Sequence, residues 1–252
     1  MKIGFFGDSY CDLLYKFKET PRYFKPWSRR LIEDNKLTCV NSGRRGSNQF
    51  YAIDQWHKFI AKNEPLDFAL FTFTWHDRLY SNDDVRQTIM SASAERREID
   101  ACIEEINAWH GVPTGYPERV KDAIQMYYEC LYSNNEAQFN YNSQVDYILA
   151  LPNQYQDIKF IFVPNTEYSR NLACKNFTHG LLLDFAFETL SNFETGSPGI
   201  MPINCNRIGH LNDRNHDLLA QEFIHVIKNY EKYQNQIIKI DYNKFDIQPT
   251  IC

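Results

Sequence analysis

The stretch "FFGDSYCDLL", residues 5–14, predicts the first strand-and-helix unit of the fold. Two phenylalanines lead into Gly7-Asp8-Ser9, and an apolar-spaced segment follows. This order is typical of a strand, a sharp turn and a helix. Aspartate and serine are favoured at helix N-caps, so the stretch alone does not separate a capping Ser9 from a nucleophilic Ser9. The rest of the chain has to distinguish these two roles.

Short apolar segments alternate with helical patterns along much of the chain. We expect strands at residues 2–6, 37–43, 66–75 and 158–165, and helices at about 27–35, 48–62 and 212–230. Strands that alternate with helices are typical of βαβ units, whose parallel sheet is covered on both faces. The sequence therefore predicts an α/β fold, a three-layer α/β/α sandwich with a flavodoxin-like parallel sheet.

Residues 81–150 depart from this alternation because they are charged and helical in pattern throughout. Their two apolar stripes are separated by "GVPTGYP", residues 111–117, and comprise Ile99, Cys102, Ile103, Ile106 and Trp109, then Val120, Ile124, Tyr127 and Leu131. The stretch is much longer than the ~10–12 residues that a crossover needs. We expect a helical insertion after the third strand, within a single domain of residues 1–252, that forms a lid over the substrate end of the sheet.

Composition excludes several classes of protein. A hydrophobic content of 43% over 252 residues is enough for a full core, and a net charge of −5 argues against nucleic acid or anionic membrane as a partner. The seven cysteines are scattered and form no CxxC pair, which favours reduced thiols. The apolar run before Asp8 is too short for a signal peptide. We expect a soluble cytoplasmic protein without a cofactor or metal, and the oligomeric state stays open.

Four loops carry the residues suited to chemistry. In an open parallel sheet, ligands bind beyond the carboxyl ends of the strands. The loops at or near those ends contain Gly7-Asp8-Ser9, "NSGRRG" at 41–46, "TWHD" at 74–77 and "GHLNDRNH" at 209–216. Acyl transfer needs a nucleophile, a base and donors for the developing oxyanion, and these loops offer candidates for each.

These segments, in this order, resemble the four sequence blocks of the SGNH (GDSL) hydrolase superfamily. Gly7-Asp8-Ser9 is similar to the first block, whose serine is the nucleophile, and residues 41–46 are similar to the second, whose last glycine donates a backbone N–H. The resemblance implies that Ser9 is the nucleophile and that Ser9 and Gly46 form part of the oxyanion hole. Residues 74–77 occupy the place of G-x-N-D, so His76 replaces the asparagine that normally donates to the oxyanion.

The fourth block fits in two registers. Residues 210–220 match the family's spacing downstream of the catalytic histidine when His210 is the base, but the family's aspartate is then replaced by Arg207. Asp213-x-x-His216 matches the bare Asp-x-x-His pattern instead, and His216 would then share a helical face with buried apolar residues. We expect His210 to be the base and keep Asp213 with His216 as the alternative pair.

The resemblance implies a serine-dependent esterase that acts on an O-acetyl or other acyl ester of a small molecule or carbohydrate. An acyltransferase on the same fold is one alternative. A catalytically weakened binding module for a glycan is another, favoured by the two departures at His76 and Arg207. A nucleotide-binding Rossmann domain is less favoured, because "GRRGSN" at residues 43–48 lacks the G-x-G-x-x-G pattern.

Overall fold

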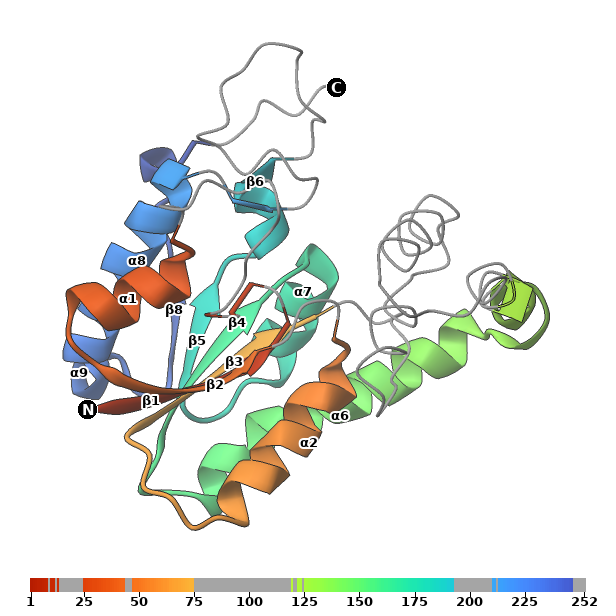
Figure 1. Ribbon diagram of the computed structural model, residues 1–252, viewed down its shortest axis with the longest axis horizontal. Coiled ribbons are helices and arrows are strands. Elements are labelled where there is room, and N and C mark those ends of the chain that lie inside the picture. Colours follow the sequence, from red (N-terminus) through yellow and green to blue (C-terminus); the bar gives the residue numbers. More distant parts are fainter. Residues whose placement is uncertain are drawn as a thin grey trace.

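A six-stranded sheet forms the centre of the computed structural model, which describes residues 1–8, 10–11, 13, 25–43, 47–74, 119, 122–123, 125–192, 210–211 and 213–246. The strand order is β2-β1-β3-β4-β5-β8, and every adjacent pair is parallel. The strands are β1 (Lys2–Gly7), β2 (Thr38–Gly43), β3 (Phe68–Phe73), β4 (Lys159–Pro164), β5 (Leu181–Asp184) and β8 (Gln236–Lys239). The predicted parallel α/β sheet is therefore confirmed (Figure 1).

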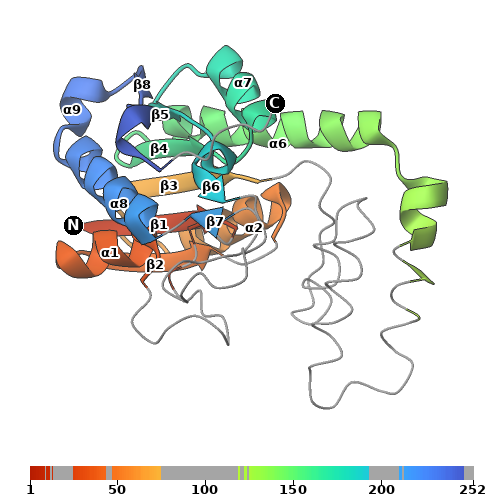
Figure 2. The ribbon, with the colours of Figure 1, turned by 90° about the horizontal axis from the view of Figure 1, so that it is seen from above.

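Helices cover both faces of this sheet (Figures 1 and 2). One face carries α1 (Trp27–Asp34) and α8 (Asp213–Lys228), with α9 (Tyr230–Tyr233) beside them, and the other carries α2 (Gln49–Ile60), α6 (Asn134–Gln154) and α7 (Glu167–Asn176). The short elements are a π-helix, η1 (Tyr127–Leu131), two 3-10 helices, η2 (Phe187–Leu190) and η3 (Tyr242–Lys244), and a strand pair, β6 (Ser191–Asn192) and β7 (His210–Leu211). This arrangement is the predicted three-layer sandwich.

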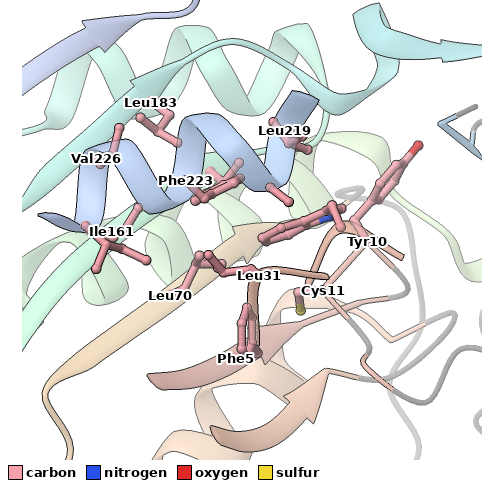
Figure 3. Packing of buried hydrophobic residues seen from close by; sticks show 14 of the residues in the cluster. Phe5, Tyr10, Cys11, Leu31, Leu70, Ile161, Leu183, Leu219, Phe223 and Val226 are labelled. Carbon is pink, nitrogen blue, oxygen red and sulfur yellow. The ribbon is translucent and has the colours of Figure 1, made fainter. Parts of the chain in front are cut away.

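Side chains of each central strand alternate between the two layers of core. Phe5 of β1 belongs to the cluster under α1 and α8, whereas the next residue, Phe6, belongs to the cluster under α2 and α6. Figure 3 shows Leu70, Ile161 and Leu183 of the sheet facing Phe223 and Val226 of α8. Both faces are apolar because both are buried, which explains the continuous hydrophobic runs of the strands.

The predicted helix at 48–62 is observed as α2, but its inward face differs at one position. Phe50 keeps helical spacing with the apolar residues Ile53, Trp56 and Ile60, yet it is 44% exposed. The buried face of α2 instead runs through Gln49, Ala52, Ile53, Trp56 and Phe59. Gln49 takes the inward position at the start of the helix because its side chain bonds the backbone N–H of Thr74.

The end of the predicted insertion belongs to the core. Within α6, the buried face comprises Tyr141, Val145, Ile148, Leu149 and Leu151, and α6 extends beyond the sheet at its other end (Figure 2). Leu131, expected on the second apolar stripe, is 74% exposed. Residues 75–118, with the first stripe, lie outside the described residues, so the lid stays a prediction.

The helix expected directly after Ser9 is not seen in the residues described there. Residues 10, 11 and 13 lie in a turn, and residues 14–24 are outside the described ranges.

Among the helices of the described chain, none is long and apolar enough to cross a membrane. The four cysteines in these ranges, Cys11, Cys39, Cys130 and Cys174, are free thiols.

Gly7 ends β1 where β3 comes very close. A methyl group at Gly7 would lie 1.9 Å from Oγ1 of Thr72. We therefore expect Gly7→Ala to lower the free energy of unfolding by about 1–3 kcal/mol, as overpacking does. The double variant Gly7→Ala/Thr72→Ala should be less destabilised than the sum of the two single changes, measured by urea unfolding. If the losses of unfolding free energy from the two single changes simply added, the close contact between Gly7 and Thr72 would be contradicted.

Candidate active site

Polar side chains are buried at the carboxyl ends of β1, β3 and β4. Eight of them, called the polar cluster below, are Asp8, Ser47, Gln49, Thr72, Thr74, Asn165, Thr166 and Ser169. Strand order reverses at β1, which pairs with β2 on one side and β3 on the other. Ligands of open α/β sheets bind at such a switch point. The polar cluster thus lies where the fold predicts a site.

Asp8 is the fully buried carboxylate of the polar cluster. Its Oδ1 accepts a hydrogen bond from the backbone N–H of Tyr10 at 3.1 Å. Its Oδ2 accepts from Nδ2 of Asn165 at 2.7 Å and from Oγ1 of Thr74 at 3.0 Å. Burying a carboxylate is costly unless donors replace its water, and these three donors come from β1, β3 and β4 or the residues just after them. Asp8 therefore joins three strand ends.

The residues on both sides of Ser9 are held in a turn. The backbone N–H of Cys11 donates to the carbonyl of Asp8 at 3.2 Å. The ring of Tyr10 stacks on Phe187 of η2, with 4.6 Å between centroids. Ser9 itself lies outside the described residues, so its nucleophilic role stays a prediction, but both of its neighbours are buried and hydrogen-bonded.

Thr74 connects the turn after β1 to the other two segments that are predicted to donate to the oxyanion, those of Gly46 and His76. Its Oγ1 lies 3.0 Å from Oδ2 of Asp8 and 3.2 Å from the carbonyl oxygen of Ser47. Ser47 directly follows Gly46, and Thr74 comes two residues before His76. Gly46 and His76 are themselves outside the described ranges. The structure nevertheless brings together the described neighbours of Ser9, Gly46 and His76.

His210 lies in a short strand rather than in the loop that we expected. β7 pairs antiparallel with β6, and Asn192 is opposite His210. The next residue, Leu211, is fully buried in the core and fixes this strand. η2, which carries Phe187 under Tyr10, leads directly into β6. The continuous segment of η2 and β6 therefore contacts both the backbone of His210 and the ring of Tyr10. The side chain of His210 is not described.

The alternative pair makes its described contacts with α1. Asp213 forms an ion pair with Arg30. Buried His216, in the first turn of α8, accepts a hydrogen bond at Nδ1 from the backbone N–H of Trp27 at 3.0 Å. That N–H is at the start of α1, where no helical partner exists for it. These contacts favour a structural role for His216, namely joining α8 to α1.

Further titratable groups lie near the carboxyl edge. Burial raises the pKa of the Tyr141 phenol on α6, and a hydrogen bond with Ser169 offsets part of this increase. Asp184, at the end of β5, accepts a hydrogen bond from Arg170 at 2.6 Å, and this bond is the main cause of a raised Arg170 pKa. Tyr141 is thus neutral and Arg170 charged at neutral pH. In the part of the chain that the structure describes, no group of three His, Cys, Asp or Glu side chains could hold a metal ion.

Asp8, Thr74 and Asn165, which are joined through the Asp8 carboxylate, have no site role that the sequence alone predicts. Asn165 lies at the end of a predicted strand, Thr74 stands where the resembled block has glycine, and Asp8 belongs to the Gly7-Asp8-Ser9 motif. The available signal was positional, because each is a polar residue directly after an apolar strand. Buried polar groups need partners, so such residues at neighbouring strand ends tend to bond one another.

Comparisons with known proteins give distant structural similarity. No protein-family model matches the chain, and no curated protein matches it. An acetylxylan esterase mutant from Geobacillus stearothermophilus is 14% identical with a TM-score of 0.47, covering 90% of this chain and 93% of its own. A lipase/acylhydrolase from Enterococcus faecalis is 14% identical with a TM-score of 0.40, covering 91% and 96%.

A third solved structure, from Desulfitobacterium hafniense, is a candidate lipolytic protein of the G-D-S-L family. It is 12% identical with a TM-score of 0.40, and the match covers 89% of this chain and 98% of that protein. Identities and TM-scores this low transfer neither an activity nor a residue's role. The resemblance to SGNH (GDSL) hydrolases rests on the sequence blocks described above, and the chemistry has to be argued from this chain's own residues.

The two histidine registers predict opposite phenotypes. His210→Ala should lower ester turnover by ~10³-fold or more with little change in the melting temperature. His216→Ala should lower the free energy of unfolding by about 1–3 kcal/mol, because the buried N–H of Trp27 loses its acceptor. His225→Ala, at an exposed position of α8, is the control and should change neither quantity. A dispensable His210 with essential Asp213 and His216 would reverse the assignment.

Proposed function

We propose that the protein is a serine-dependent carboxylic ester hydrolase. Its substrate is an O-acetyl or other small acyl ester carried by a small molecule or a carbohydrate. The observation that carries this proposal is the position of the Thr74 hydroxyl, within hydrogen-bond distance of both Asp8 and the carbonyl of Ser47. It holds together the chain next to Ser9, Gly46 and His76, the three segments that an oxyanion hole would need.

In the proposed reaction, His210 removes the proton of the Ser9 hydroxyl while Oγ attacks the ester carbonyl. The carbonyl oxygen becomes an oxyanion that accepts hydrogen bonds from the backbone N–H groups of Ser9 and Gly46 and from the ring N–H of His76. The alcohol leaves with the proton held by His210, and an acyl-serine remains. Water then attacks this acyl group, with His210 acting as base again, and releases the acid and free Ser9.

The base lacks the aspartate of the resembled family. Arg207 occupies that position in the sequence, so Asn204, Asn206 or a backbone carbonyl would orient His210. None of these neutral groups stabilises an imidazolium as a carboxylate does, and turnover should accordingly be slow.

The direct test is labelling by a fluorophosphonate probe, which reacts with activated serines whatever the natural substrate is. Ser9→Ala should abolish labelling and turnover of p-nitrophenyl acetate. The melting temperature should change little, because only a cap hydroxyl worth ~1 kcal/mol is lost. Ser143→Ala, which removes an exposed hydroxyl on α6, is the matched control and should retain both activities.

Labelling that survives Ser9→Ala would contradict the serine mechanism. A wild-type protein that takes no label and turns over no ester, yet binds an oligosaccharide, would favour the glycan-binding module instead.

His76 is the second test, because it replaces the family's asparagine. If its ring N–H donates to the oxyanion, His76→Ala should lower kcat by ~10²–10³-fold with little change in KM. His76→Asn should restore part of kcat, since an amide can donate in the same way. Reduced stability with unchanged kcat would identify His76 as a structural histidine.

A further inference from the structure

We propose that Thr74 is a positioning residue for the ester hydrolysis proposed above, on which this inference rests. Thr74 occupies the position where the resembled block has glycine, a residue without a hydroxyl. The side chain is almost fully buried, with 1% of Thr74 exposed. It acts through the turns at Ser9 and Gly46 rather than on the substrate.

The Thr74 hydroxyl has one proton and, among the described residues, two hydrogen-bond acceptors. The carboxylate of Asp8 is the closer one at 3.0 Å and carries charge, which strengthens a hydrogen bond. The carbonyl of Ser47 lies 3.2 Å away on the same oxygen. A three-centre hydrogen bond of this kind links Asp8 and Ser47 to the hydroxyl oxygen of Thr74, directly after β3.

These contacts close a ring. From Thr74, one branch leads through Asp8 to its backbone neighbour Gly7, and the other leads to Ser47. The hydroxyl of Ser47 then donates to the carbonyl of Gly7 at 3.0 Å. A shift of the turn after Gly7 therefore has to disturb the segment that starts at Ser47, and the reverse also holds.

Thr74 is further fixed through its backbone. Its N–H donates to Oε1 of Gln49, in the first turn of α2, at 3.0 Å. The amide of Asn165, directly after β4, donates to the same carboxylate oxygen of Asp8 as Thr74 does, at 2.7 Å. Thr74 and Asp8 are thus each held by a further partner, so the bridge between them has little freedom.

Such a bridge affects the chemical step more than substrate binding. Backbone donors stabilise an oxyanion only when they lie ~2.7–3.1 Å from it, and a misplacement of about 1 Å can cost ~10²-fold in rate. Thr74 should therefore contribute to kcat and to the rate of serine labelling, with a small effect on KM.

The experiment compares three variants of the full chain. Thr74→Val replaces the hydroxyl by a methyl group of similar size and should slow both fluorophosphonate labelling and kcat by ~10–100-fold, with KM within threefold. Thr74→Ser keeps the hydroxyl and should retain wild-type labelling within about threefold. Tyr230→Phe is the matched control, because it removes another buried, hydrogen-bonded hydroxyl, the one that bonds the backbone of Phe160 near the start of β4 and lies outside the polar cluster.

Tyr230→Phe should lower the melting temperature without slowing labelling of the folded protein, which separates positioning from stability. If Thr74→Val folds poorly, Thr74→Ala replaces it with the same expectation. Labelling of Thr74→Val at the wild-type rate, or equal slowing by Thr74→Ser, would overturn this inference alone. A wild-type protein that takes no label on Ser9 would overturn the proposed function and this inference with it.

Discussion

The buried carboxylate of Asp8 holds the carboxyl ends of three strands together through its hydrogen bonds. A fully desolvated carboxylate requires donors, and three of them converge on it from separate strand ends. Loss of any one would leave the group undersatisfied at a cost of about 1–3 kcal/mol. The same bonds that satisfy Asp8 fix the ends of β1, β3 and β4 relative to one another. The requirement for buried hydrogen bonds therefore also assembles the candidate site.

Aromatic packing supports this edge from the layer of α1 and α8. Phe223 of α8 stacks on Trp27 with centroids 4.3 Å apart, and Trp27 stacks on Phe187 at 5.9 Å. Phe187 in turn stacks on Tyr10 at 4.6 Å. This row of rings runs from the core to the residue after Ser9, so the apolar core and the polar cluster hold the same turn from two sides.

Much of the fold could be predicted from sequence because the central strands are continuous apolar runs. β1, β3 and β4 were expected within a few residues of their observed bounds, as were α1, α2 and α8. The strands β5 and β8 were missed because each has only four residues and β8 is a largely exposed edge strand. The helix α7 was missed because only Ser169 and Ala173 of it are buried, which leaves no apolar stripe to recognise.

The candidate site was harder to predict than the fold. Motif order pointed to the edge of the sheet at which Asp8, Ser47 and Thr74 meet. The bonds among them depend on strand order and register, which local sequence does not encode. The role of His216 depended on the backbone N–H of Trp27, a residue far away in the chain. Such long-range partners explain why two histidine registers stayed open.

In the proposed mechanism, the segments that carry Ser9, Gly46 and His76 meet around one oxyanion. The most direct measurement is a crystal structure of the protein after reaction with a fluorophosphonate, whose phosphonyl oxygen mimics that oxyanion. The account predicts phosphorus bonded to Oγ of Ser9, with its oxygen ~2.7–3.1 Å from the backbone nitrogens of Ser9 and Gly46 and from a ring nitrogen of His76. An adduct on another residue, or an oxygen directed away from Gly46 and His76, would contradict it.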